Sequence, residues 1–191
     1  REVTWGVSAK ADLARIKKEL SKDRVVTEDK DGTLHCVDDS GLGIAFRKTR
    51  RTPIKQKGEL LNSPGNVVRT NGRGTYYDRA TPLHIGHVVL NIPNFEQARD
   101  FYVNRLGFAI SDNYPGHGVF LRCEAEHWHH NLFFLKTADG SKSLNHVAFA
   151  VRDIHEMFAG GKYINEHGWK TAVGPGRHVV SSCYFWYFQN P

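Results

Sequence analysis

The sequence predicts an α+β fold built from three copies of a βαβββ module. Each copy begins with a short apolar run of β character, continues with apolar residues at helical spacing, and ends in further strand-like runs. This order recurs at residues 2–47, 83–135 and 146–188. With 191 residues, of which 40% are hydrophobic and 24% charged, the chain is long enough for one large or two small globular domains.

In the first copy, residues 3–7 are predicted as a strand, and Leu13, Ile16 and Leu20 recur at helical spacing after it. Ser8 stands where the cap of this helix is expected. The strands that complete the copy are predicted at 25–27, 33–37 and 43–46.

The second and third copies carry clearer helix signals. Asn94 and Gln97 resemble a capping box, and Gly107 stands where a left-handed glycine ends a helix. In the third copy, Asp153 and Glu156 repeat the capping pattern. The strands of these two copies are predicted at 87–92, 108–112, 119–123, 130–135, 146–151 and 171–173, and from Val179 or Val180 to Phe188.

Residues 48–80 interrupt the repeats and divide the chain into 1–47, 48–80 and 81–191. The middle segment is rich in Lys and Arg and contains the turn sequences Ser63-Pro64-Gly65 and Asn71-Gly72-Arg73-Gly74, which is typical of a solvated connector. A nucleic-acid-binding arm would need aromatic residues that stack on bases, and only Tyr76 and Tyr77 are available there. Since a net charge of +6 is also modest, we expect no nucleic-acid partner.

Pairing between modules is expected because a βαβββ unit alone exposes one apolar sheet face. The second and third copies are expected to pair with each other, which leaves the first without a partner in this chain. Met157 is the only methionine, and the sequence begins with Arg1. We therefore expect the sequence to be a piece of a longer protein, truncated at both ends.

The three cysteines are widely spaced and form no Cys-x-x-Cys pair, which argues against a disulfide framework and a thiolate zinc site. This pattern favours a reducing, cytoplasmic compartment. No apolar run approaches the roughly 18 residues of a membrane span, so no membrane association is expected.

His87 and His146 occupy the same position in the first strands of the second and third copies. Because side chains alternate along a strand, Val88, Leu90 and Ile92 share one face of the first strand of the second copy, and this face should pack on that module's helix. In the third copy, Val147 and Phe149 should pack on their module's helix in the same way. The histidines then line the opposite, concave face. Two imidazoles from symmetry-related strands converge on one point, which predicts a metal site.

Three further motifs accompany the two His-Val openings. They are the sequence of the predicted helix and its end at 98–108, the His129-His130-Asn131-Leu132 sequence, and Gly176-Arg177-His178 before the strand that carries Tyr187. With these motifs the sequence resembles the vicinal oxygen chelate superfamily, and within it the type I extradiol ring-cleaving dioxygenases of the catechol 2,3-dioxygenase kind. The resemblance covers essentially the whole chain.

The resemblance implies half-open mixed β-sheet barrels with flanking helices. Residues 1–47 would be one module of a metal-free N-terminal domain, 48–80 the linker, and 81–191 a catalytic domain of two modules without its last strand. It also implies an extradiol dioxygenase that opens a catecholic substrate with O2, and a homo-oligomer in the cytoplasm.

The resemblance further implies the site residues. His87 and His146 would bind Fe(II), or alternatively Mn(II), together with a glutamate of the final strand that this chain does not contain. Glu124, Glu126, Glu156 and Glu166 do not stand on that strand. His130 would be the acid/base residue, and His178 and Tyr187 would contact the substrate oxygens.

Strand alternation predicts His130, Leu132 and Phe134 on one face, so that only one of His129 and His130 faces the concave side. Two alternatives stay open on the same scaffold: a glyoxalase-like isomerase and a metal-free small-molecule-binding protein. The first would want carboxylates at metal positions in both modules. The second would leave His87 and His146 without a metal.

Overall fold

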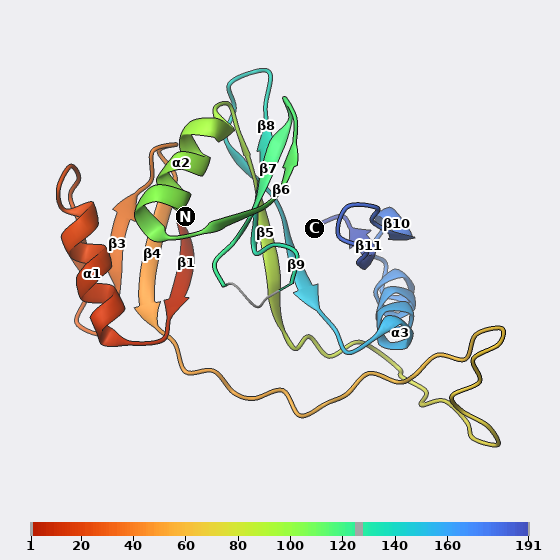
Figure 1. Ribbon diagram of the computed structural model, residues 1–191. Coiled ribbons are helices and arrows are strands. Elements are labelled where there is room, and N and C mark those ends of the chain that lie inside the picture. Colours follow the sequence, from red (N-terminus) through yellow and green to blue (C-terminus); the bar gives the residue numbers. More distant parts are fainter. Residues whose placement is uncertain (1, 125–127, 191) are drawn as a thin grey trace. The chain divides into compact units, whose positions relative to one another are not determined.

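The elements of the chain follow the order that the repeat pattern predicts (Figure 1). The computed structural model describes residues 2–124 and 128–190. The elements are β1 (Glu2–Val7), α1 (Lys10–Leu20), β2 (Thr27–Glu28), β3 (Leu34–Val37), β4 (Gly43–Lys48), β5 (His84–Ile92), α2 (Phe95–Leu106), β6 (Ala109–Tyr114), β7 (Gly118–Arg122), β8 (Leu132–Lys136), β9 (Ser143–Ala150), α3 (Ile154–Glu166), β10 (Thr171–Arg177) and β11 (Tyr184–Phe188). The predicted mixed α+β fold of βαβββ modules is thereby confirmed.

By packing, the chain falls into two compact units. The first contains the residues up to Pro53 together with Gly86–Ala148, and the second contains Ile54–Ile85 together with the residues from Phe149 onward. Each unit is thus assembled from two separate stretches of sequence. The division into domains at 1–47, 48–80 and 81–191 stays a prediction about the order of modules along the chain.

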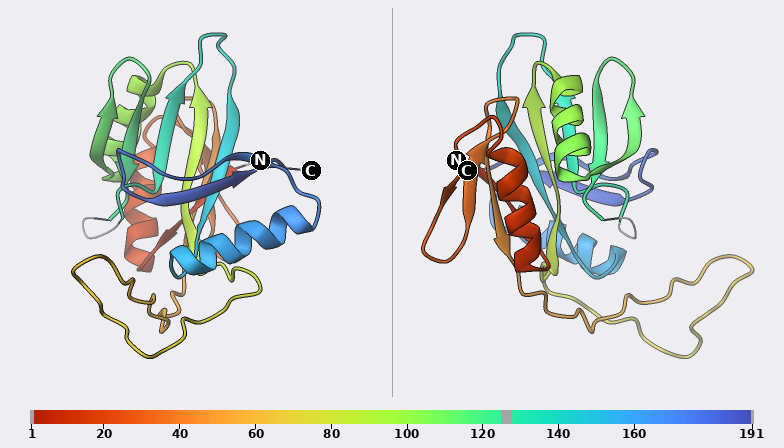
Figure 2. Two further views of the ribbon diagram at one scale, coloured as in Figure 1. Left: turned by 90° about the vertical axis from the view of Figure 1, so that its right-hand side faces the viewer. Right: turned by 60° about the vertical axis from the view of Figure 1, so that its left-hand side comes forward.

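The first module forms a four-stranded sheet in the order β1-β4-β3-β2, in which β1 and β4 run parallel. Helix α1 lies along this sheet (Figure 2) and buries Ile16 and Leu20. Its N-cap is Ala9, whose backbone N–H donates to the Asp12 carboxylate at 3.1 Å. The prediction that Ser8 caps the helix is therefore wrong, because Asp12 reaches back to the helix start from inside the first turn.

The second module supplies four strands of a five-stranded sheet, in the order β6-β7-β8-β5-β9. Strand β9, the first strand of the third module, completes this sheet beside β5. Helix α2 packs on β7 and β8, begins where Asn94 Oδ1 accepts from the Gln97 N–H at 3.1 Å, and ends at Gly107 with φ 82°. Asn94 as the N-cap and Gly107 as the C-terminal glycine are confirmed, and the predicted capping box is represented by its Asn94 half.

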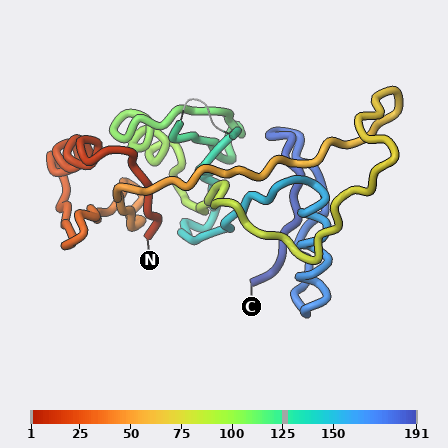
Figure 3. Tube along the Cα trace, turned by 90° about the horizontal axis from the view of Figure 1, so that it is seen from below, coloured from red at the N-terminus to blue at the C-terminus, as the bar shows by residue number. Residues whose placement is uncertain are grey.

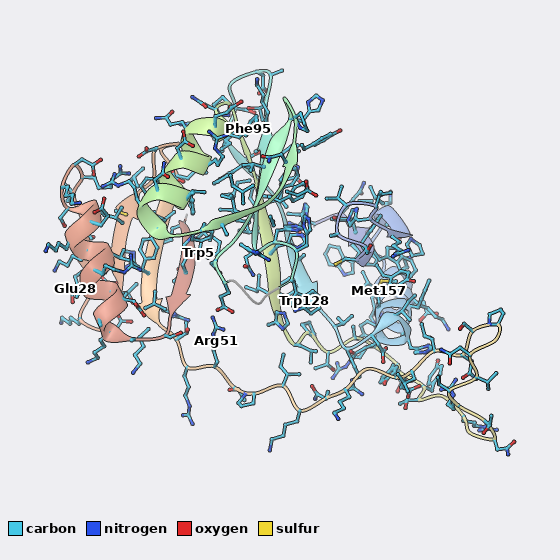
Figure 4. The ribbon with its side chains drawn as sticks, viewed as in Figure 1. Trp5, Glu28, Arg51, Phe95, Trp128 and Met157 are labelled. Atoms are coloured by element: carbon cyan, nitrogen blue, oxygen red, sulfur yellow. The ribbon has the colours of Figure 1, made fainter. Side chains whose placement is uncertain are left out.

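One hydrophobic core joins the first and second modules, so the expectation that the first copy lacks a partner is wrong. Tyr102 of α2 is fully buried and meets the ring of Trp5 edge-on, with ring centroids 6.3 Å apart. Its hydroxyl donates to Asp38 Oδ2 at 3.3 Å, and burial raises the pKa of the Asp38 carboxyl. Figure 4 labels Trp5 on the first sheet. The reason for the partnership is that α2 presents bulky aromatic side chains to both sheets.

In the second unit, Glu59 of the predicted connector and Thr81, which follows the connector, are both bonded to the start of α3. Asp153 caps α3 by accepting from the Glu156 N–H at 3.0 Å, and it also accepts from the Glu59 N–H at 2.9 Å. The Glu156 carboxylate accepts from the backbone N–H groups of Arg152 at 2.7 Å and Thr81 at 3.1 Å. The predicted capping box is thus half formed, since Glu156 binds these amides instead of that of Asp153. Figure 3 traces the connector between its two ends.

Strands β10 and β11 form a separate two-stranded antiparallel sheet. Trp186 packs against Gly161 of α3, and its Nε1–H donates to Thr171 Oγ1 at 2.9 Å. The predicted strand start at Val179 or Val180 is wrong. A turn occupies this stretch, with Ser182 at φ 56° and the His178 N–H donating to the Cys183 carbonyl at 2.9 Å.

One packing expectation for the third copy is also wrong. Phe149, which belongs to the same unit as α3, is 59% exposed instead of buried against that helix. The reason is the strand order: among the described strands of this module, β10 and β11 pair only with each other and β9 joins the sheet of the second module. In the part of the chain that is described, no helix is long and apolar enough to cross a bilayer.

His35 of β3 links two carboxylates on the first sheet. Its Nδ1 lies 3.0 Å from Glu2 Oε2, and its Nε2 lies 3.0 Å from Asp29 Oδ2. The bond to Glu2, followed by the bond to Asp29, raises the pKa of His35. A histidine with a raised pKa in the folded state stabilises the fold below its unfolded pKa, and the contribution is lost as pH rises through the folded value.

We therefore predict that wild-type protein unfolds at a higher urea concentration than His35→Gln at about pH 5.5 and that this difference shrinks by about pH 8.5, since a free histidine titrates near ~6.5. Urea unfolding curves of both proteins at both pH values measure it. A difference that grows with pH would contradict the assignment.

Candidate active site

His87 of β5 and His146 of β9 project from neighbouring strands of the five-stranded sheet. Their Nε2 atoms lie 3.2 Å apart, and their ring centroids are separated by 5.3 Å. Val88 and Leu90, on the other face of β5, belong to the hydrophobic core as alternation predicts. The structure thus brings the two predicted ligand histidines to one point.

This spacing suits a shared metal ion. Two nitrogen ligands that are each about 2.1 Å from a metal and subtend roughly a right angle lie about 3 Å apart. Without a cation, two imidazole nitrogens at hydrogen-bond distance need a proton between them, because two lone pairs facing each other repel. A metal ion can take the place of that proton.

A chain of side-chain amides orients His146. Its Nδ1 lies 2.8 Å from Asn145 Oδ1, an oxygen that only accepts, so Nδ1 carries the proton and Nε2 keeps its lone pair. Asn145 Nδ2 donates to Asn91 Oδ1 at 3.1 Å, and Asn91 Nδ2 donates to Ser143 Oγ at 3.0 Å. Asn91 lies four residues after His87 on β5. The sequence analysis missed Asn145, whose only signal is its position next to His146.

His130 lies two residues before the start of β8, and its ring centroid is 4.2 Å from that of His87. The prediction that His130 shares a face with Leu132 and Phe134 is wrong, because those two residues are buried in the core while His130 lies beside Phe120 at 5.0 Å. The strand begins at Leu132, so alternation does not extend back to the histidines.

The adjacent histidines His129 and His130 lie on the same side of the chain, contrary to the prediction from alternation. Both His129 and His130 contact the Phe120 ring, which stacks on Phe133 at 4.0 Å. The expectation that only one of the two histidines faces this side is therefore wrong. The result is a cluster of imidazoles beside a stacked aromatic pair, an arrangement that combines proton-carrying groups with a flat apolar surface.

His178 and Tyr187 come together in the second unit. His178 Nε2 lies 3.0 Å from Tyr187 Oη, and the imidazole stacks on Phe185 at 3.9 Å. Burial lowers the pKa of His178 and raises the pKa of Tyr187. The predicted site residues thus form two groups, the imidazoles of the first unit and the His178–Tyr187 pair of the second.

The described residues contain no group of three or more His, Cys, Asp or Glu side chains placed to hold a metal. Glu124 is paired with Arg51, which Figure 4 labels, Glu166 lies 3.7 Å from Lys162, and Glu156 binds backbone amides. Glu126 lies outside the described residues. The expectation that the third ligand comes from elsewhere stays a prediction.

The comparisons identify the family. The model of the Glyoxalase/Bleomycin resistance protein/Dioxygenase superfamily matches residues 84–191, and the chain belongs to that superfamily, as the sequence motifs indicated. Metapyrocatechase 2 of Cupriavidus necator is 29% identical over 163 residues, which cover 85% of this chain and 48% of that protein. The chain therefore spans about half the length of this curated relative.

Solved structures share the fold. A halotolerant catechol dioxygenase, BphC, superposes with a TM-score of 0.75 at 17% sequence identity. The match covers 100% of this chain and 63% of the BphC chain. A Mn(II)-bound glyoxalase from Novosphingobium aromaticivorans superposes with a TM-score of 0.72 at 22% sequence identity. The match covers 98% of this chain and 58% of the glyoxalase chain. Both likenesses support the predicted architecture.

The partly buried position of His178 generates a prediction. Because burial disfavours the imidazolium, His178 should titrate below its value in the unfolded chain, and the stability it contributes should be present at neutral pH and lost as pH falls through the folded pKa. NMR titration of the His178 ring in folded and urea-unfolded protein measures both values. A folded value at or above the unfolded one would contradict this account.

Proposed function

We propose that this chain is the metal-binding part of an extradiol ring-cleaving dioxygenase, which opens a catecholic ring with O2. The observation that carries the proposal is the approach of His87 and His146 to 3.2 Å, with Asn145 holding the His146 Nε2 lone pair toward His87. Membership of the superfamily and the similarity to a metapyrocatechase favour this reaction over others on the same scaffold.

His87 and His146 would hold Fe(II), or alternatively Mn(II), and a carboxylate from outside this chain would complete the set. Two imidazoles and one carboxylate leave one face of an ion open, and the ion when bound supplies a place where a catecholate and O2 are held side by side. The chain's own contribution would be to keep His146 Nε2 deprotonated and its ring fixed, because the Asn145 side chain bonds His146 Nδ1 and is itself held by Asn91.

His130 would accept and return a proton of a substrate hydroxyl. Its ring lies against that of His87, so a group bound beside His87 is within its reach. The stacked Phe120 and Phe133 rings offer an apolar wall for an aromatic substrate. His178 and Tyr187 would hydrogen-bond the substrate oxygens, a role that suits a neutral imidazole paired with a phenol hydroxyl.

Loss of either strand histidine should abolish metal binding. We predict that His87→Ala and His146→Ala bind neither Fe(II) nor Mn(II) in anaerobic titrations followed by bound-metal analysis and Mn(II) EPR, because one imidazole alone leaves the ion largely to solvent. His167→Ala, which removes an exposed histidine at the end of α3, is the matched control and should bind metal like wild type. Wild-type metal content in both site variants would refute the ligand assignment.

Removal of the proposed proton carrier should leave the metal in place. We predict that His130→Ala keeps its metal and slows catechol turnover by roughly 10²–10⁴-fold, which is the usual contribution of a positioned acid/base residue. Added imidazole should restore part of the rate in this variant. Undiminished turnover would remove His130 from the mechanism.

The function itself is tested with metal-loaded protein, a series of simple catechols and O2. A yellow ring-opened product, formed with consumption of O2, is the expected result. Bound metal with no O2 consumption on any catechol, together with isomerisation of a glutathione hemithioacetal, would replace the proposal with the glyoxalase alternative. Neither reaction combined with tight catechol binding would favour a binding protein.

A further inference from the structure

We propose that Asp112 and His129 are positioning residues that hold His130 as its Nδ1–H tautomer through a carboxylate–imidazole–imidazole chain. The tautomer of His130 is a property of the folded chain alone, and only its use in catalysis rests on the proposed function. Neither Asp112 nor His129 was among the site residues that the sequence predicted.

The three side chains form a continuous series. Asp112 Oδ2 lies 3.5 Å from His129 Nε2, and His129 Nδ1 lies 3.0 Å from His130 Nδ1. Asp112 stands in β6 just after a register shift between Ile110 and Asp112, in the position that pairs with Phe120. The Phe120 ring contacts both imidazoles, with centroid distances of 5.2 Å to His129 and 5.0 Å to His130. Strand pairing and ring packing therefore set the geometry of the series.

The direction of the hydrogen bond between the two imidazoles follows from the charge at the end of the series. The negative Asp112 carboxylate, 3.5 Å from His129 Nε2, favours the His129 tautomer that carries its proton on Nε2. In a neutral His129 this leaves Nδ1 as the acceptor, and the bond between the two Nδ1 atoms must then be donated by His130. His130 consequently keeps its proton on Nδ1 and presents the lone pair of Nε2.

This tautomer is the one that a proton acceptor needs at Nε2. When His130 takes a proton there, its Nδ1–H remains bonded to His129, and the Asp112 carboxylate lies on the far side to balance the new positive charge. The same logic governs the aspartate that orients the histidine of a catalytic triad. Here a second imidazole stands between the carboxylate and the working ring.

The first experiment reads the tautomer directly and needs no metal, substrate or turnover. Protein labelled with ¹⁵N-histidine is measured by long-range ¹H–¹⁵N correlation at about pH 8, above the ordinary histidine pKa of ~6.5. We expect His130 to appear as the Nδ1–H form and His129 as the Nε2–H form. The Nε2–H form at His130 in wild-type protein would overturn the proposal.

A matched pair of variants separates hydrogen bonding from packing. In His129→Asn the side-chain oxygen can accept from His130 Nδ1–H, whereas His129→Leu has nearly the same shape and cannot accept. We expect His129→Asn to retain the Nδ1–H form of His130 and His129→Leu to lose it, with the same bound metal and similar melting temperatures. An equal tautomer in both variants would overturn the proposal.

Turnover then tests the catalytic consequence. We expect His129→Leu and Asp112→Leu to lower kcat about 10–100-fold with little change in KM or metal content, and His129→Asn to recover most of kcat, since supporting hydrogen bonds have effects of this size. Equal loss of kcat in the Asn and Leu variants of His129 would overturn the positioning role. If wild type turns over no catechol while its tautomer is as expected, the proposed function fails and the positioning of His130 stands.

Discussion

The structure depends most on the adjacency of β5 and β9 in one sheet, because this places equivalent side chains of two modules next to each other. His87 and His146 meet there at 3.2 Å. Because both modules carry a histidine at the same position of these strands, the duplicated position becomes a pair of neighbouring imidazoles. The side-chain amides of Asn91 and Asn145, which support His146, come from the same two strands.

The shared core explains how the sheet that carries His87 and His146 is held in place. Tyr102 of α2 packs on Trp5 of the first module and donates to the buried Asp38, and Arg105 of the same helix pairs with Glu19 and Asp23 of the first module. The first module therefore packs against α2, on the helix-covered side of the second module's sheet. The opposite side of the second sheet is left to the imidazoles and the stacked Phe120 and Phe133 rings.

Periodicity and capping chemistry predicted the modules, both Asn94 and Gly107 at the ends of α2, and the meeting of His87 with His146. These features depend on short-range rules that a sequence displays directly. The errors have a different origin. Alternation failed at His130 because it was extended past the true start of β8, and Asp112 and Asn145 were missed because their partners are set by strand register and by loop geometry. The partner of the first module was missed because Tyr102 reads as an ordinary residue of a helical stripe.

The buried carboxylate of Glu156 has a consequence for how this polypeptide is made. It joins Thr81, which precedes β5, to Arg152, which follows β9, so each compact unit is interleaved in sequence with the other. During synthesis the first unit can close only after β9 has left the ribosome, and residues 54–85 must wait longer still for their helix. Such long-range closure is slow compared with local folding, which exposes the waiting segment to proteases and chaperones in the nascent chain.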